Sequence, residues 1–139
     1  MVVDASKEDG VSLGRFEKGE ILVIQYVSGT YSPPNYSPPV LINPDSTDHA
    51  RRFYSSSERP PRLVGPMQSS RKRIREIPKG TSSKPFAVII DDPGFYNLSA
   101  YSGDRWYHWT GTITYQITKY SVIQSAQLKN TEQVNNYQW

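Results

Sequence analysis

The sequence contains no cysteine among its 139 residues, and this absence excludes several kinds of chemistry. Disulfide bonds, cysteine–zinc sites and thiol nucleophiles all need a thiol group. Long hydrophobic runs are missing as well, since the densest one, Phe86–Ile90, is far shorter than the roughly 18 residues of a membrane helix. Met1–Asp4 lacks the basic and apolar regions of a secretory signal. We therefore expect a cytoplasmic protein with no membrane partner, although export by a non-classical route stays open.

A strong charge of one sign is also missing, because the formal net charge is only +3. Such a balance does not by itself mark a nucleic-acid binder. The two histidines, His49 and His108, are not spaced as zinc ligands, and the sequence has no nucleophile elbow. Because no set of mutually activating groups can be recognised, we expect that the protein is not an enzyme.

Aromatic residues and chain-breaking residues are abundant instead. The 10 tyrosines, 3 tryptophans and 4 phenylalanines bring large surfaces to bury together with polar groups that need hydrogen bonds. The 11 prolines and 9 glycines interrupt the chain too often for long helices. A chain of this length fits one domain. We expect a β-rich core with long irregular connections.

Alternating and β-branched segments predict the strands. Glu20–Val27 is the clearest early strand, and Gly10–Phe16 is expected to form a hairpin with it through a tight turn at Gly19. Four later strands are expected at residues 62–67, 73–77, 85–90 and 111–118. About seven short strands separated by turns predict an all-β fold, an antiparallel β-sandwich of the jelly-roll or galactose-binding-like type with long loops at one end.

The side on which each residue lies follows from the two-residue period of a strand. In the segment 111–118, this period places Ile113, Tyr115 and Ile117 on one face. The same rule directs Arg73 and Arg75 to solvent.

The remaining segments divide the chain. Residues 30–61 and 95–110 are expected to be long loops. Residues 1–123 are expected to form a single β-sandwich domain. Residues 124–139 are expected to form a polar tail. A short helix, an edge strand and a disordered end are the alternatives for it.

Several weak motifs stand in a particular order along the chain. They are Glu17–Ile24, Ser28–Tyr31, Asn43–Asp45 with His49, Leu63–Gly65, Ile89–Tyr96 and Thr110–Thr114. In this order, over about residues 10–118, they resemble the galactophilic PA-I lectin family, small calcium-dependent β-sandwiches of bacteria. The resemblance implies a bacterial lectin-like module that binds a carbohydrate or glycoconjugate, with sugars of the galactose type as its ligands.

The resemblance also implies roles for individual residues. In that family an aspartate and backbone carbonyls hold calcium, and a histidine from a long loop contacts the sugar. Asp92 matches the aspartate, and Tyr36 or Tyr31 matches a tyrosine that offers its carbonyl. His49 roughly matches the histidine.

The family's second calcium-binding element is a pair of asparagines, and here this sequence differs. Depending on the side from which the motif is aligned, the pair is replaced by His108–Trp109 or by Leu98–Ser99, with Asn97 nearby. Calcium prefers six to eight oxygen ligands, and the side chains of Trp109 and Leu98 supply none. Calcium is therefore the cofactor that the resemblance implies, with an incomplete set of ligands in this sequence.

Acidic residues give a candidate metal site independently of the resemblance. Asp91 and Asp92 are adjacent, and Asp104 stands in the following aromatic segment as a third carboxylate. The alternative is that the sequence Asp91–Gly94 is an ordinary turn, because aspartate and glycine both favour turns.

An aromatic segment suits a sugar-binding surface. Trp106, His108 and Trp109 combine rings that stack on a sugar with a polar group, and Asp45 and Asn97 add further hydrogen-bonding groups. The alternative is that some of these rings pack over one end of the sandwich. Our leading hypothesis places the Tyr36 segment, the Asp45–His49 segment, Asp92 and these aromatic residues together at one end.

A basic segment gives a second hypothesis of another class. Arg71, Lys72, Arg73 and Arg75 could contact nucleic acid or a protein together with exposed aromatic rings, in a non-enzymatic interaction domain. The alternative is a solvated outer face, where such residues also protect a sheet edge. The oligomeric state stays open, a homo-oligomer included.

Overall fold

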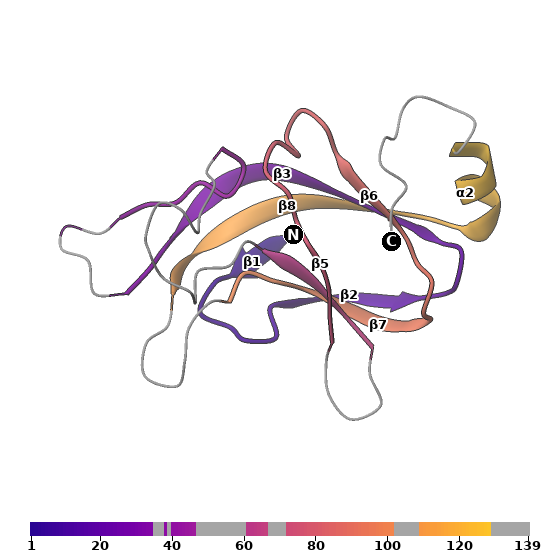
Figure 1. The fold of residues 1–139 in the computed structure, drawn as a ribbon, viewed down its shortest axis with the longest axis horizontal. Coiled ribbons are helices and arrows are strands. Elements are labelled where there is room, and N and C mark those ends of the chain that lie inside the picture. Colours follow the sequence, from indigo (N-terminus) through magenta and orange to yellow (C-terminus); the bar gives the residue numbers. More distant parts are fainter. Residues whose placement is uncertain (35–37, 39, 47–60, 67–71, 102–108, 129–139) are drawn as a thin grey trace.

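The structure of the protein is a computed structural model. It describes residues 1–34, 38, 40–46, 61–66, 72–101 and 109–128, and of residues 72–74 and 128 it describes the backbone alone. The described residues form two antiparallel four-stranded sheets and one short helix (Figure 1). The predicted all-β sandwich is confirmed. In the described part of the chain, no helix is long and apolar enough to cross a membrane.

The first sheet contains the longest strands. Its order is β1 (Val2–Asp4), β8 (Thr110–Tyr120), β3 (Ile21–Ser32) and β6 (Phe86–Ile89). The ladder between β3 and β8 runs from the pair Ile21–Tyr120 to the pair Ser32–Thr110, so these two strands span the full length of the sheet.

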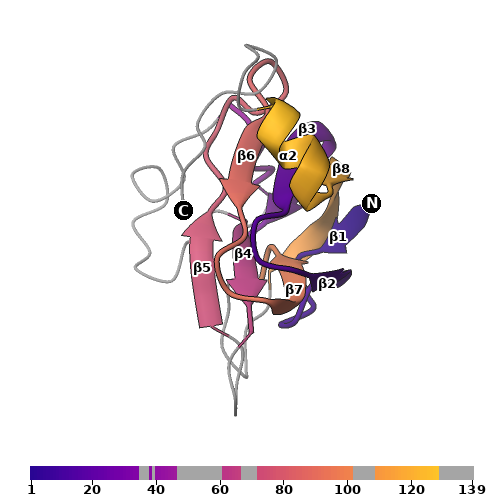
Figure 2. The same cartoon turned by 90° about the vertical axis from the view of Figure 1, so that its right-hand side faces the viewer.

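The second sheet lies across the core from the first. Its order is β2 (Val11–Phe16), β7 (Gly94–Ser99), β4 (Arg62–Gly65) and β5 (Lys72–Glu76). Figure 2 shows the two layers from the end of the sandwich that carries the helix α2 (Val122–Leu128).

The predicted hairpin between Gly10–Phe16 and Glu20–Val27 is wrong. A turn does join β2 to β3, with Gly19 at a φ of 92°. However, β2 pairs with β7 in the second sheet, whereas β3 pairs with β6 and β8 in the first. The amide of Gly19 donates to the carbonyl of Ile90, the residue that follows β6. This hydrogen bond fastens the turn to the end of β6 and does not close a hairpin. A turn between two sheets and a hairpin turn have similar local sequences, so the sequence pattern did not separate them.

The predicted loop 95–110 is wrong in its first half, because residues Gly94–Ser99 form the central strand β7. Tyr96 and Leu98 alternate into the core and are fully buried. The outward residues Asn97 and Ser99 are polar, so the segment alternates as a strand does, but only over the four residues Tyr96 to Ser99. Both bind backbone carbonyls of the segment before β2, so their polarity is satisfied within the fold.

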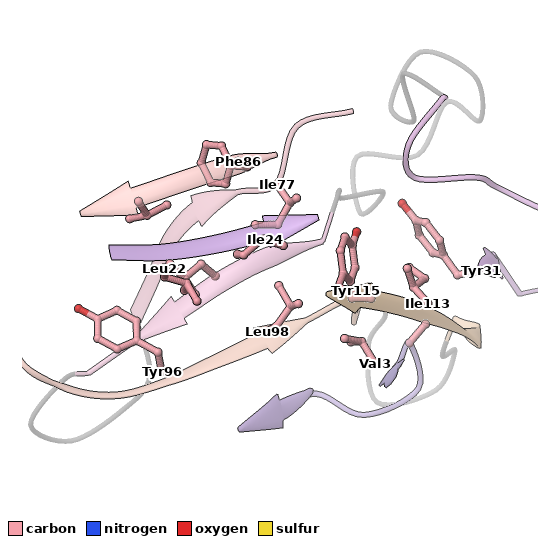
Figure 3. Close-up of a cluster of buried hydrophobic side chains, with 14 of the residues drawn as sticks. Val3, Leu22, Ile24, Tyr31, Ile77, Phe86, Tyr96, Leu98, Ile113 and Tyr115 are labelled. Carbon is pink, nitrogen blue, oxygen red and sulfur yellow. The ribbon is translucent and has the colours of Figure 1, made fainter. Parts of the chain in front are cut away.

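The main core fills the space between the sheets (Figure 3). Leu22 and Ile24 of β3 meet Leu98 of β7, and all three are fully buried. Ile113 and Tyr115 also point into this core, as their alternation predicts. Burying large side chains of this kind contributes about 1.5–3 kcal/mol each to the free energy of folding.

A second, smaller apolar cluster lies apart from the main core. It consists of Ile21, Val23 and Ala87, with Ile89 and Tyr120 packed against it. These residues occupy the alternate positions of β3 and β6, so both faces of the predicted strand 85–90 are indeed apolar and largely buried. The helix α2 follows this cluster, and it spans the boundary at residue 123 that we predicted between the domain and its tail.

The two ends of the sandwich are built differently. At one end, called here the turn end, the tight turn Glu17–Glu20 joins the sheets, and Asp91–Asp92 lies beside it. At the other, called here the loop end, Ser32 pairs with Thr110 in the first sheet and Arg62 pairs with Ser99 in the second. The two ends are therefore fixed by the strand register.

Candidate functional site

Aromatic rings gather in the loop-end half of the core. The rings of Tyr31 and Trp109 pack with centroids 4.9 Å apart, and those of Tyr26 and Tyr115 meet edge to face at 6.0 Å. Trp109, Tyr31 and Tyr115 are at most 2% exposed, whereas Tyr26 is partly exposed. The prediction that Trp109 offers its ring to a sugar is therefore wrong, since the ring fills the core instead. Tyr26 is the member of this group that reaches the surface.

Asp45 is the centre of a polar network beside Tyr26. Its backbone amide donates to the side-chain oxygen of Asn43 at 2.8 Å, which forms a turn of the kind that asparagine favours. Its carboxylate accepts hydrogen bonds from the amide of Ser82, at 3.1 Å, and from the Ser82 hydroxyl. The Thr81 hydroxyl lies 3.5 Å from the same carboxylate. Two loops that are far apart in the sequence are joined in this way.

Tyr26 connects this network to β3. Its amide donates to the Thr81 hydroxyl at 2.9 Å, and its own hydroxyl donates to the carbonyl of Gly29 at 2.6 Å. Burial and the nearby charge of Asp45 raise the pKa of Tyr26, while a hydrogen bond with the Asn43 side chain acts in the opposite direction. Tyr26, Asn43 and Asp45 thus form a connected, partly exposed polar group, called here the Tyr26–Asp45 site.

The described donors do not fill every hydrogen-bonding position of the Asp45 carboxylate. A carboxylate offers about four lone-pair positions to donors. The described donors to Asp45 are the Ser82 amide, the Ser82 hydroxyl and the more distant Thr81 hydroxyl. Room for about one further donor, such as a hydroxyl group of a ligand, therefore remains on the carboxylate.

Asn97 does not belong to a ligand site. Its side chain is 4% exposed, and its amide nitrogen donates to the carbonyl of Asp9 at 2.8 Å. The neighbouring Ser99 hydroxyl donates to the carbonyl of Glu8 at 3.0 Å. The prediction that Asn97 binds a ligand is therefore wrong, because its amide holds the segment before β2 against β7.

Asp91 and Asp92 lie at the turn end, away from the Tyr26–Asp45 site. Ile89 pairs with Ile21 at one end of β3, whereas Ser32 at the other end pairs with Thr110, next to Trp109. These β3 positions are about 11 residues apart, so Asp92 and Trp109 are separated by on the order of 30 Å. The prediction that Asp92 shares one end of the sandwich with Trp109 is wrong.

The environment of Asp91 and Asp92 is that of a turn. Both side chains are exposed, and the backbone carbonyl of Asp92 accepts a hydrogen bond from the hydroxyl of Tyr96. In the described part of the chain, no three acidic or histidine side chains lie together as metal ligands. Leu98 and Trp109, one from each of the two alternative alignments of the asparagine pair, are core residues. The described residues therefore do not fit the calcium site that the resemblance implies.

Several predicted residues lie outside the described residues. They are Tyr36, His49, Asp104, Trp106, His108 and Arg71. The same holds for the side chains of Lys72 and Arg73. The roles proposed for these residues stay predictions.

The prediction that Arg75 points to solvent is wrong. It pairs with Leu63, a fully buried core residue, and directly opposed residues share a face of the sheet. Its guanidinium lies over the ring of Phe86, 5.2 Å from the centroid. Arg75 therefore covers the edge between β5 and β6, where the two sheets meet, and only part of its side chain is free to contact a partner.

Comparisons of the chain with protein-family models, with curated proteins and with solved structures found no match. The candidate site therefore depends on the geometry of the chain itself.

The sequence predicted Asp45 and missed the residues around it. The motif Asn43–Asp45, one of those that carry the resemblance, named one member of the network. Thr81 and Ser82 stand 36 or more residues away and carry no motif. Tyr26 follows the apolar run Ile21–Ile24 of β3 and carries no motif of its own.

Proposed function

We propose that the protein is a non-enzymatic, lectin-like module that binds a carbohydrate at the Tyr26–Asp45 site. The observation that carries the proposal is the connected group of a tyrosine, an asparagine and an aspartate, partly exposed beside an aromatic cluster. Sugar sites combine an aromatic surface with a few hydrogen-bonding side chains of this kind. The resemblance to the galactophilic PA-I lectins supports the same function and suggests galactose-type sugars.

The position of the site within the fold also supports this proposal. The described residues Ser32, Ser46, Tyr101 and Trp109 flank the segments that contain Tyr36, His49, Trp106 and His108. Ser32 and Trp109 adjoin the loop end through the pairing of β3 with β8, and Arg62 binds the carbonyl of Tyr101 at 2.6 Å on the second sheet. The flanking residues Ser32, Tyr101 and Trp109 therefore lie at the loop end rather than beside Asp92.

The alternative, contact with nucleic acid or a protein through the basic segment, has weaker support. Arg75 is held over Phe86, and a guanidinium in this position is already stabilised by the ring. We therefore rank this function second.

The function is tested first with the unmodified chain on a glycan array, with and without calcium. We expect neutral, galactose-type glycans to be retained. Loss of retention on addition of a chelator would show that calcium takes part. A blank array in both conditions would overturn the proposed function.

The location of the site is tested with a matched pair of substitutions. We expect Asp45→Asn to lower the affinity for a retained glycan by about 10-fold or more, the loss of one hydrogen bond to a charged group. Asp92→Asn removes the same charge at the turn end and is expected to leave the affinity unchanged. Titration calorimetry measures both, and urea unfolding shows whether Asp45→Asn stays folded. If Asp92→Asn alone weakened binding, the site would lie at the turn end.

A further inference from the structure

The edge of β8 is only partly covered by its neighbour β1. The register pairs Val2 with Thr114, and next to this pair Met1 and Tyr115 exchange backbone hydrogen bonds. β8 continues to Tyr120 with β3 on its other side. Among the described strands, none pairs with this last part of β8 on the side of β1. An open strand edge of this kind can pair with another chain.

The backbone groups of two residues face the open edge. The hydrogen-bonding groups of a strand alternate between its two sides, and those of Tyr115 point to β1. The amides and carbonyls of Ile117 and Lys119 therefore point to the same side, beyond the end of β1. In the described part of the chain, no hydrogen bond occupies these groups. They are free to form a short ladder with a strand of another molecule.

The side chain of Lys119 lies at the same edge and points inward. Its strand partner is Leu22, a fully buried residue, so Lys119 shares the inner face of the first sheet. Its amine donates to the carbonyl of Arg15 at 2.7 Å and lies 4.8 Å from the centroid of the Phe16 ring. The carboxylate of Glu20 is 3.6 Å away. Lys119 thus joins β8 to β2, the edge strand of the second sheet on the same side of the sandwich (Figure 2).

A partner strand at this edge would change the surroundings of the Lys119 amine. The side chain is 44% exposed, and a strand beside it would remove water from the ion pair with Glu20. Taking an ion pair out of water costs free energy even though its members attract each other. In a two-fold antiparallel pairing centred on Thr118, the two copies of Lys119 would also lie diagonally about 7–8 Å apart, where like charges repel.

We propose that Lys119 prevents the open edge of β8 from pairing with the same edge of a second copy of this chain. A second copy is the partner that fits, because the two edges are identical. In the two-fold pairing, Ile117 of each copy faces Lys119 of the other, and all the free amides and carbonyls of both edges are used. The proposal concerns association of the chain and does not depend on the proposed function.

A matched pair of substitutions tests the role of Lys119. Lys119→Val removes the charge at the open edge, and Lys18→Val removes the same charge from an exposed position in the turn Glu17–Glu20. We expect Lys119→Val to associate at least about 10-fold more tightly than the unmodified chain and to reach the mass of two chains. Lys18→Val should keep the mass of one chain. Sedimentation equilibrium at several protein concentrations measures both.

Two further variants separate edge pairing from other effects of the substitution. Lys119→Gln keeps a donor for the Arg15 carbonyl and removes the charge, so it should associate as well, and it serves if Lys119→Val folds poorly. Adding Ile117→Pro to Lys119→Val removes an edge amide that the fold does not use, and this should restore the monomer. Hydrogen exchange measured by NMR reports the ladder directly. The amides of residues 117 and 119 should exchange fast in the unmodified chain and slowly in the dimeric variants.

Several outcomes would overturn the proposal. If Lys119→Val and Lys119→Gln both stayed monomeric, the charge would not be what prevents pairing. Equal association of Lys18→Val, or a dimer that survives Ile117→Pro, would place the contact elsewhere. A dimeric unmodified chain with slow exchange at residues 117 and 119 would show that Lys119 tolerates the pairing. None of these results bears on sugar binding, which the glycan array measures separately.

Discussion

Tyr96 shows how a single polar group is fixed by its surroundings. Its ring packs edge to face against Phe16 at 5.6 Å, and its hydroxyl binds the carbonyl of Asp92. Burial is the largest cause that raises its pKa to about 12, and the charges of Asp92 and Asp91 add to it. The neutral form of the side chain is thus favoured in the folded protein.

This shift predicts a pH dependence of stability. An unfolded tyrosine ionises near pH 10, whereas Tyr96 in the folded protein keeps its proton until about pH 12. The folded state therefore binds more protons in this window, and the stability that is present below pH 10 is lost as the pH rises from 10 to 12. Urea unfolding of the unmodified chain and of Tyr96→Phe between pH 8 and 12 measures the effect. We expect the variant to lose less stability over this range, and equal slopes would contradict the assignment.

The prediction of the site was limited by residues whose side chains suit a ligand but are buried in the fold. Asn97 has an amide that suits a ligand, yet that amide binds Asp9, a residue 88 positions earlier. Trp109 has a ring that suits a sugar, yet Tyr31 covers it. Such partners are distant in the sequence, so no local pattern reveals that they have already used the group. Asp45 was named through the resemblance motif Asn43–Asp45, and its turn with Asn43 is a local contact.

At the scale of elements, the ladder between β3 and β8 depends on a close approach at Gly29. This residue has a φ of 105°, and a side-chain carbon at its position would lie 2.3 Å from the carbonyl oxygen of Thr112. Gly14 in β2 has a similar φ of 89°, but no atom lies within 4 Å of the corresponding position. The two glycines therefore share their backbone conformation and differ in available space.

This difference predicts unequal effects of the same substitution. We expect Gly14→Ala to destabilise the protein by about 1–2 kcal/mol, the cost of a left-handed conformation. Gly29→Ala adds a clash with the backbone of β8, so it should cost about 3 kcal/mol or more. Urea unfolding measures both free energies. Equal losses would mean that β3 and β8 approach less closely than described here.

Strands with a long apolar run or a long alternation could be predicted, and the shorter strand β7 could not. The β-branched run in β3 and the strict alternation in β8 identified both strands, although β3 extends further, to Ser32. In β7 the apolar–polar alternation covers only Tyr96 to Ser99, because the outward residue Phe95 is apolar and exposed. The helix α2 begins with a capping box, in which Ser121 and Gln124 bind each other's backbone amides. This local signal was present in the sequence, but the prediction left the tail open.

At the scale of the whole molecule, the register of β3 separates two regions that the family resemblance places together. The resemblance rests on the order of motifs, and order along the chain does not state how far apart the motifs lie. Asp92 at the turn end and Asp45 beside Tyr26 are consequently in different surroundings. The fold class could be predicted because it follows from the number of strands and turns. Which loops lie close together depends on the register of the strands, and the sequence does not give this register.

The dependence of binding on salt distinguishes the two functions for the molecule as a whole. Binding to phosphate groups releases counterions, so contacts from the four cationic residues of the basic segment would weaken affinity by roughly 10²-fold between 50 and 200 mM salt. Hydrogen bonds and stacking with a neutral sugar involve no such release. We expect the affinity for a retained glycan to change less than about 2-fold over this range. A steep loss, measured by titration at four salt concentrations, would instead support binding through the basic segment.

The position of β8 between β1 and β3 has a consequence for synthesis of the protein. On the ribosome, β1 emerges first among the described strands, and its one described partner, β8, emerges last. Translation adds about 5–20 residues per second, so the roughly 100 intervening residues take about 5–20 s. Throughout that interval β1 and one edge of β3 have no neighbour, and the nascent chain is open to association with other chains or with chaperones. The first sheet therefore cannot be completed until β8 has been synthesised.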